Sequence, residues 1–351
     1  MSSITQRRRL RGINIGGCRE LARLCMAGEA AGVPGFCAAY TAGSTNWMPD
    51  DAALLPGSDV DVMVVVAGGD LAGTRRKFMR DGVLFEVSYL SQDLFEPPER
   101  VLSDYHLAPS LQTAKVVVDP EGRLDRARDV LRRGYEDPRW IRARCEMARA
   151  KVLAVLGSES ETGCLFAAGI TAHILLVAGR RNPTVRGRYG AVRALLADHG
   201  FGEFHETLLE LLGSRRVSAG RAATHAVALG EAFDAACGSM PGSFGFAADI
   251  QECTRPAAID ASMEMIARGE HREAMFWIGV TWTRCMTVPA TDRFQEGFRE
   301  VLRDLGLSSG AAIGQRRREI ERALPRVCGV AEQIIESTAR TPSPSQAPHC
   351  R

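Results

Sequence analysis

The chain has 351 residues, of which 45% are apolar and 25% charged, and its formal net charge is only +2. This length exceeds the usual size of a single domain, so we expect two domains, and the composition excludes a wholly disordered chain. The balanced charge gives no reason to expect a nucleic-acid or membrane partner.

The N-terminus has a basic run, Arg7-Arg8-Arg9 with Arg11, which we interpret as a solvated arm rather than a phosphate-binding or targeting segment. The ten cysteines are scattered without C-x-x-C spacing, so they resemble small buried hydrophobic residues more than zinc or redox sites. With no apolar signal segment behind the arginines, we predict a cytoplasmic protein.

The first third of the chain alternates helical and strand patterns. Residues 17–30 have apolar side chains at helical spacing, and the Val33-Pro34-Gly35 break that follows leads into an apolar strand. The strongest strand pattern is that of residues 59–66, in which every second residue is a valine. The predicted strands are 36–42, 59–66, 84–90 and 115–118.

From about Pro138 the apolar residues recur at helical spacing. We predict helices over 140–157, 164–179, 184–199, 203–213, 218–237, 257–268, 272–286, 291–306 and 313–337. The change of pattern predicts a domain boundary, with residues 1–138 in one domain and 139–338 in a helical one. Residues 339–351, rich in proline and serine, are predicted to be a disordered tail. The predicted fold class is α+β: a small sheet with flanking helices, followed by an all-α domain.

Three acids carry the strongest indication of chemistry. Asp59 and Asp61 are two residues apart on a predicted strand, so their carboxylates project from the same face. Neighbouring carboxylates repel each other, and a bound divalent cation relieves that repulsion. Glu86, in the next predicted strand, would complete a cluster able to hold two metal ions if it faces the same way.

Gly43-Ser44 precedes the acids at the end of the first predicted strand. A glycine there lets backbone N–H groups approach a phosphate, and the serine hydroxyl adds a donor. Each element has a simpler explanation: Gly43-Ser44 as a turn, Asp59 and Asp61 as a solvated strand end, and Glu86 as a surface residue. Their occurrence together, in this order, favours a site.

A Gly-Ser pair, two acids separated by one apolar residue and a third acid within an apolar strand resemble the signature of the DNA polymerase β-like nucleotidyltransferase superfamily. The resemblance covers residues 17–120, and the gap between Ser44 and Asp59 is longer than the family usually has. It implies a catalytic domain over 1–138 in which Asp59, Asp61 and Glu86 bind two Mg²⁺ ions. Gly43 and Ser44 would then contact a nucleoside triphosphate, with ATP the first to test.

The helical half is similar in kind to the acceptor-binding domains of small-molecule nucleotidyltransferases that modify aminoglycosides. Such a domain implies a small-molecule acceptor, transfer of a nucleoside monophosphate to its hydroxyl and release of pyrophosphate. The base is then Glu86 or Glu146, although for Arg142 and Glu146 we favour the simpler interpretation, a surface i,i+4 pair. Two alternatives stay open: nucleotidylation (AMPylation) of a protein, as by a regulatory or toxin–antitoxin enzyme, and a non-catalytic nucleotide-binding module. The sequence does not indicate an oligomeric state.

Three features of the helical half are interpreted as structural. The basic segment 180–189 is taken as a solvated helix start that begins near Asn182, rather than as a lining of the site. His173 lies on an apolar helix and is expected to be a hydrogen-bonded core residue. The apolar stretch 164–179 is shorter than the roughly 20 residues that span a bilayer, so we predict a buried helix.

Overall fold

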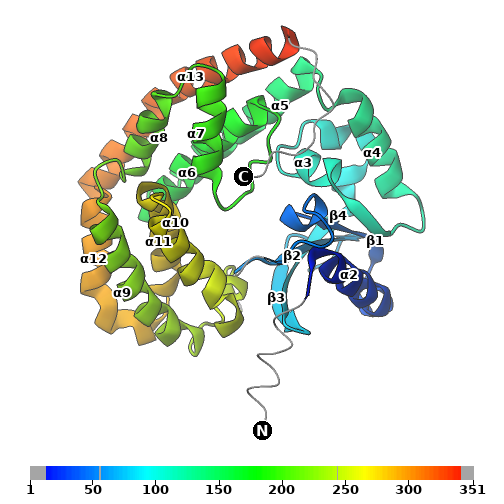
Figure 1. Cartoon of the computed structure of the whole chain (residues 1–351), viewed down its shortest axis with the longest axis horizontal. Coiled ribbons are helices and arrows are strands. Elements are labelled where there is room, and N and C mark those ends of the chain that lie inside the picture. Colours follow the sequence, from blue (N-terminus) through cyan, green and yellow to red (C-terminus); the bar gives the residue numbers. More distant parts are fainter. Residues whose placement is uncertain (1–12, 55–56, 243, 341–351) are drawn as a thin grey trace. The chain divides into compact units, whose positions relative to one another are not determined.

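The computed structural model describes residues 13–54, 57–242 and 244–340, and Figure 1 labels its elements. These residues divide into two compact units. The first contains the residues up to 102 and 107–135 and is called the sheet unit here. The second contains residues 103–106 and those from 136 onward and is called the helical unit. The predicted α+β fold class is confirmed. The basic run at residues 7–11 and the tail beyond residue 340 lie outside the described residues.

A sheet of five strands, counted over the described residues, forms the centre of the sheet unit, in the order β3-β4-β2-β1-β5. β2 and β4 are parallel, and the other neighbours are antiparallel. All four predicted strands are confirmed, while β3 was not predicted because arginine and lysine fill four of its six positions. The strands are β1 (Phe36–Ala42), β2 (Val60–Val66), β3 (Arg75–Arg80), β4 (Val83–Ser91) and β5 (Lys115–Val118).

Helix α2 (Ile15–Glu29) covers one face of this sheet. It begins after Asn14, whose side chain accepts a hydrogen bond of 2.9 Å from the Gly17 N–H. Its buried face packs on alternate residues of the two parallel strands, all of them fully buried: Val60, Val62, Phe85 and Val87. Because strand residues alternate between faces, this core fixes the opposite face for the residues in between.

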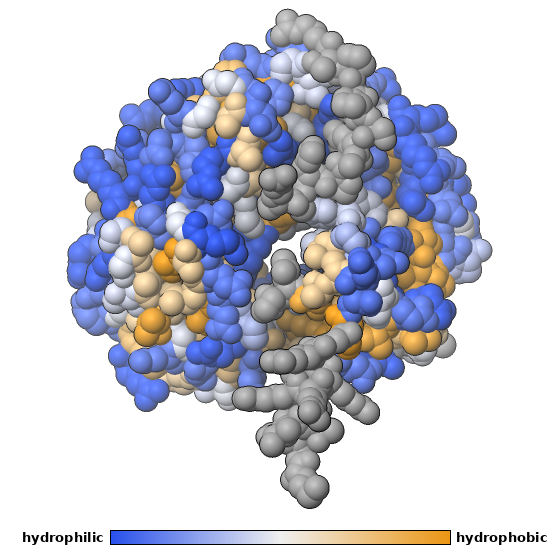
Figure 2. All heavy atoms as spheres, viewed as in Figure 1, coloured by the Kyte–Doolittle hydropathy of each residue, from blue (hydrophilic) through white to orange (hydrophobic). Residues whose placement is uncertain are grey.

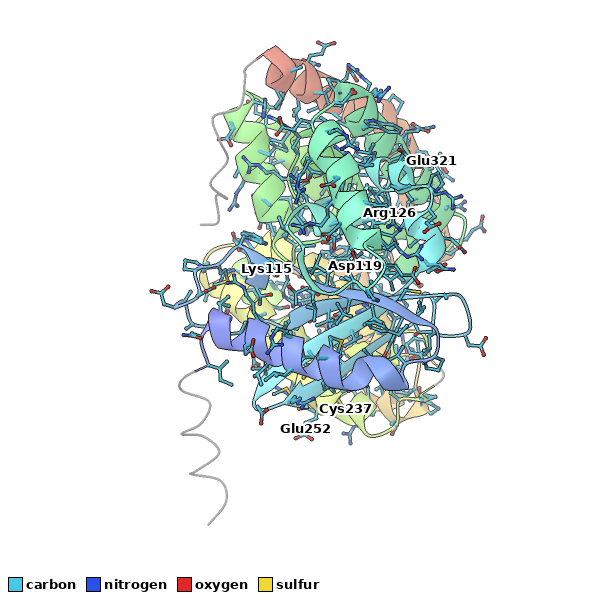
Figure 3. The ribbon with its side chains drawn as sticks, turned by 90° about the vertical axis from the view of Figure 1, so that its right-hand side faces the viewer. Lys115, Asp119, Arg126, Cys237, Glu252 and Glu321 are labelled. Atoms are coloured by element: carbon cyan, nitrogen blue, oxygen red, sulfur yellow. The ribbon has the colours of Figure 1, made fainter. Side chains whose placement is uncertain are left out.

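The chain after β4 forms short helices and one longer helix, α4 (Arg123–Gly134), which was not predicted. The Asp119 carboxylate caps α4 by accepting from the Arg123 N–H at 2.9 Å and the Asp125 N–H at 3.1 Å. Figure 3 labels Asp119 before α4, Arg126 within α4 and Lys115 at the start of β5. The short helices are η3 (Gln92–Phe95), η4 (Pro98–Leu102) and α3 (Leu107–Gln112).

All nine predicted helices of the helical unit are present, with shifted ends. They are α5 (Pro138–Leu156), α6 (Glu161–Ala178), α7 (Arg188–Asp198), α8 (Phe204–Leu212), α9 (Ala219–Cys237), α10 (Ala261–Ala267), α11 (His271–Cys285), α12 (Gln295–Asp304) and α13 (Gly310–Arg340). Short helical turns link some of them: η5 (Ala247–Asp249), η6 (Glu252–Thr254), η7 (Pro256–Asp260) and η8 (Pro289–Phe294). Helix α6 is the core of the unit and packs against α5, α11 and α13. The long helix α13 follows α5, α6 and α8 (Figure 1).

Among the described residues, α6 is the one helix with the length and apolar composition of a membrane span, with a mean hydropathy of 1.6. In the structure 83% of it is buried within the fold, and buried core helices commonly have the same length and apolar composition. The large apolar side chains that are exposed lie apart in the sequence, from Leu24 to Met263. Hydrophilic residues cover most of the surface seen in Figure 2.

Candidate active site

The three predicted acids come together on the face of the sheet opposite the valine core. Asp61 and Glu86 are direct partners in the register between the parallel strands β2 and β4. Asp59 lies two residues before Asp61, immediately before β2 begins. All three side chains are half-buried, so the sheet holds three carboxylates in one partly solvent-excluded cluster.

Lys77 of the edge strand β3 lies between two of these acids. Its Nζ is 3.1 Å from Asp59 Oδ2 and 2.6 Å from Glu86 Oε2. In the antiparallel register between β3 and β4, Lys77 is the direct partner of Glu86. Arg75 lies two positions earlier on the same face, and its Nη1 is 3.5 Å from Glu86 Oε1. We did not identify either residue from the sequence, because β3 lacks an apolar alternation.

The Asp61 carboxyl group has an unfavourable electrostatic setting. Burial raises the pKa of its carboxyl group well above the usual value, and the nearby charges of Asp59 and Glu86 raise it further. The positive charge of Lys77 acts in the opposite direction but does not offset them. A bound cation would stabilise the ionised form of the Asp61 carboxyl group, which its burial and acidic neighbours disfavour.

Gly43 packs directly against the carboxylate of Asp61. A Cβ atom at this position would overlap Asp61 Oδ2, and the φ angle of Gly43 is +71°, so both space and backbone conformation require glycine. Gly43 lies between the end of β1 and the 3₁₀ turn η2 (Ser44–Asn46), with Ser44 exposed beside it. The structure thus brings the predicted Gly-Ser pair next to the acids.

Arg19 of α2 organises the long loop between Ser44 and Asp59. Its guanidinium donates hydrogen bonds of 2.6 Å to the carbonyl oxygens of Thr45 and Met48, and it pairs with Asp50. The Trp47 indole N–H donates to the Gly43 carbonyl at 2.7 Å, which links the loop to the glycine. Asp50 is therefore a structural residue of this loop.

The donor set of the cluster fits Mg²⁺. The described residues contain no ready-made group of three or more histidine, cysteine or acidic side chains placed to hold a metal. Mg²⁺ does not need such a cage, because it is usually held by one or two carboxylates together with waters and substrate phosphates. The Lys77 ammonium group, placed between Asp59 and Glu86, shows that this point of the sheet accommodates a positive charge.

The predicted pairing of Arg142 with Glu146 on α5 is wrong. Arg142 instead pairs with Glu332 of α13, with its Nε 2.9 Å from Glu332 Oε1, because packing brings the two helices side by side. Glu146 accepts a hydrogen bond of 2.7 Å from Arg149, three residues later, and this bond lowers the pKa of Glu146. The second candidate base is therefore an exposed carboxylate that already has a partner.

The interpretation of residues 180–189 as a solvated helix start is also wrong. Helix α7 begins only at Arg188, and Asn182 instead accepts a hydrogen bond of 2.9 Å from the Thr184 N–H in a turn. The Arg188 side chain is buried, with its guanidinium 4.6 Å from the centre of the Phe276 ring and its Nη1 2.7 Å from His173 Nε2. Arg188 thus stabilises the interior of the unit through an aromatic face, and His173 is confirmed as a hydrogen-bonded core residue.

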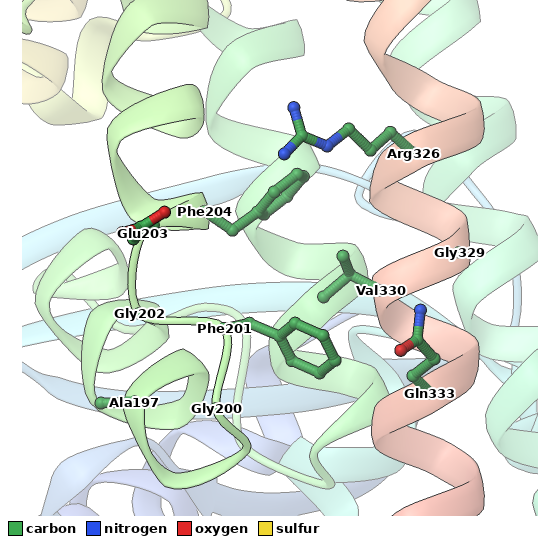
Figure 4. Close-up of a pocket in the computed structure, with 10 residues that line it drawn as sticks. All are labelled: Ala197, Gly200, Phe201, Gly202, Glu203, Phe204, Arg326, Gly329, Val330 and Gln333. Carbon is green, nitrogen blue, oxygen red and sulfur yellow. The ribbon is translucent and has the colours of Figure 1, made fainter.

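The helical unit also has a cavity of about 730 Å³ near the turn between α7 and α8. Figure 4 shows its lining, in which Arg326 of α13 extends toward Phe204. The guanidinium carbon of Arg326 lies 5.0 Å from the centre of the Phe204 ring. No predicted site residue lines this cavity, which has a mixture of apolar and polar walls.

Comparisons with known proteins show similarity to solved structures but not to sequence families. No family model matches the sequence, and no curated protein matches it. A crystal structure of a nucleotidyltransferase-like protein from Exiguobacterium sibiricum 255-15 aligns over 89% of this chain and 91% of its own, with 10% sequence identity and a TM-score of 0.28. A TM-score this low supports no conclusion about the activity of this chain.

Proposed function

We propose that this chain is a magnesium-dependent nucleotidyltransferase that moves a nucleoside monophosphate from a nucleoside triphosphate to a hydroxyl of a small-molecule acceptor. One observation carries the proposal. The Asp61 and Glu86 carboxylates are register partners on two parallel strands, and Gly43 packs against Asp61. This arrangement joins all the elements that resemble the polymerase β-like signature.

Asp59, Asp61 and Glu86 would together hold Mg²⁺. When bound, the metal would supply positive charge against the triphosphate and lower the pKa of an acceptor hydroxyl. Gly43 and the exposed Ser44 would position the phosphates at the end of β1. The acceptor oxygen forms a bond to the α-phosphorus, the bond from that phosphorus to pyrophosphate breaks, and Glu86 takes the hydroxyl proton.

The small-molecule acceptor is inferred from the sequence alone. The second region is large and helical, which suits a small molecule, and the net charge of +2 gives no indication of RNA binding. Protein nucleotidylation is the alternative within enzymes. Outside enzymes, a nucleotide-binding module without chemistry is favoured by one observation, namely that Lys77 already neutralises part of the acidic cluster.

Release of pyrophosphate tests the proposal. The four nucleoside triphosphates, ATP first, are incubated with Mg²⁺ and a panel of hydroxylated acceptors, with Asp61→Ala as the matched control. We expect pyrophosphate to form only with the wild-type chain and a hydroxylated small molecule. Full turnover by Asp61→Ala would contradict the proposal. Label transferred from ATP to protein in a lysate would favour the protein-modifying alternative.

A further inference from the structure

Lys77 is held more firmly than a surface ion pair would be. Its side chain is only 10% exposed, less than the side chains of Asp59 at 26% and Glu86 at 16%. The backbone register of β3 and β4 places it opposite Glu86. Strand pairing, and not only the ion pairs, therefore holds Lys77 among the acids.

We propose that Lys77 is the resident counter-ion of the acidic cluster and that a divalent cation must displace its ammonium group from Asp59 and Glu86 in order to bind. This inference rests on the proposed function, since it assigns Asp59 and Glu86 to the metal. It adds a competition between a side chain and the cation for the same oxygen atoms.

The competition follows from the distances. Mg²⁺ binds carboxylate oxygens at about 2.0–2.1 Å. The ammonium group now contacts Asp59 Oδ2 and Glu86 Oε2 at hydrogen-bond distance. Two positive charges on the same oxygens would repel each other strongly in a site with little water, so only one can remain.

The displaced ammonium group would remain on the same face of the sheet. Strand residues two apart share a face, so Lys77 stays on the acid-bearing side of the sheet, beside Arg75. Its flexible four-carbon stem allows the ammonium group to move while the β3 backbone stays paired with β4. The ammonium group then lies on the face where the triphosphate is proposed to bind.

The opposing possibility is that Lys77 permanently replaces a metal ion, as the non-catalytic alternative would require. The two differ in what happens when the positive charge is removed. If Lys77 is a displaceable counter-ion, it competes with the cation, so removing the lysine should increase the affinity for the cation. If Lys77 permanently replaces the metal ion, the site should bind no divalent cation, whether or not the lysine is present.

The experiment measures binding of Mn²⁺, as a probe for Mg²⁺, to the full-length chain without nucleotide, by the electron paramagnetic resonance signal of free Mn²⁺. Lys77→Met removes the counter-ion. Arg80→Met is the matched control, because it removes one positive charge from an exposed position of the same strand that has no acidic partner in the described part of the chain. We expect Lys77→Met to bind Mn²⁺ about tenfold more tightly than wild type, and Arg80→Met to stay within about twofold.

Thermal unfolding gives a second readout. Without metal, Lys77→Met should unfold at a lower temperature than wild type, and Mn²⁺ should raise its melting temperature by more than that of wild type. If Lys77→Met does not fold, Lys77→Gln replaces it, since the amide can still donate a hydrogen bond to one acid without a charge.

The proposal is overturned if Lys77→Met binds Mn²⁺ no more tightly than wild type. In that case a wild-type chain that binds Mn²⁺ and releases pyrophosphate leaves the proposed function intact. Absence of Mn²⁺ binding in wild type and Lys77→Met alike also overturns it, and the proposed function is then decided by the pyrophosphate assay, in which Lys77 is unchanged.

Discussion

Asp61 of the sheet unit and several surface acids of the helical unit stand in opposite electrostatic settings. In the helical unit, hydrogen bonds from arginine partners lower the pKa of several surface carboxylates: Glu146, Glu206 and Glu332. In the sheet unit, burial and two acidic neighbours raise the pKa of Asp61. An acid that is hydrogen-bonded to an arginine stabilises the fold, and this is enough to explain its presence. An acid that is buried beside other acids destabilises the fold. The crowded cluster is therefore the part of the molecule that points to a ligand.

Asp61→Asn should have the largest effect on function and should not harm the fold. Loss of this carboxylate from the proposed metal site is expected to reduce pyrophosphate release by about three orders of magnitude. Without metal, the melting temperature at neutral pH should be unchanged or higher, because the substitution removes a charge from a crowded cluster. Kinetics and thermal unfolding measured together check both. A clear loss of stability would mean that Asp61 is a structural residue.

Gly43→Ala should disturb the fold and the site together. The backbone at Gly43, with φ +71° and ψ −165°, lies in a region nearly restricted to glycine and costs an alanine about 1–3 kcal/mol, and overlap with the Asp61 carboxylate should add about 2 kcal/mol. Gly68→Ala is the matched control, because Gly68 has a φ angle of +77° with open space around it. Denaturant unfolding of both variants isolates the contact with Asp61. Equal losses would show that this contact contributes nothing.

Arg19→Met should loosen the loop between Ser44 and Asp59. It removes two charged hydrogen bonds to backbone carbonyls, so we expect a loss of about 2 kcal/mol in the free energy of unfolding and weaker binding of nucleotide. Arg23→Met, on the same helix with an exposed acidic partner, is the control and should show no measurable loss. If the two variants behave alike, Arg19 does not organise the loop.

Asp304→Asn should have the smallest effect, and that effect should depend on pH. Partial burial acts to raise the pKa of Asp304, but hydrogen bonds from Arg221 and the buried His225, whose Nε2 is 2.7 Å away, lower it by more. A lowered pKa stabilises the fold above the usual carboxyl pKa, and this stabilisation is lost as the pH falls through the native value.

We expect Asp304→Asn to lose about 1.5 kcal/mol at pH 7 and progressively less below pH about 4. Denaturant unfolding at several pH values measures this change. Glu146→Gln, in an exposed pair, should lose about 0.3 kcal/mol or less. A pH-independent loss for Asp304→Asn would show that its charge is not what stabilises the unit.

Local patterns in the sequence predicted most of the fold. They also identified five residues that lie close together in the structure, namely Gly43, Ser44, Asp59, Asp61 and Glu86. Strand alternation was enough to place Asp61 and Glu86 on a common face, because the period of a strand is two. Helical spacing identified each α-helix from α5 to α13 but not the short turns η5 and η6. The boundary at Asn182 was wrong because a polar turn mimics a helix start.

Residues that act through distant pairing could not be predicted from local patterns. Strand β3 is charged, and only its partner β4 shows that it is a strand, so Lys77 had no visible role. Arg19 reaches a loop about 30 residues later, and such a contact leaves no local pattern. The partner of Arg142, Glu332 on another helix, was missed for the same reason.

The most direct test of the acidic cluster as a metal–nucleotide site is calorimetric titration with an ATP analogue in which a methylene group bridges the α and β phosphates, with Mg²⁺ and with EDTA. It needs no knowledge of the acceptor. We predict binding by the wild-type chain with Mg²⁺, and affinity at least about tenfold lower both with EDTA and for Asp61→Asn. Equal affinity under all three conditions would contradict the assignment of Asp59, Asp61 and Glu86 to that site.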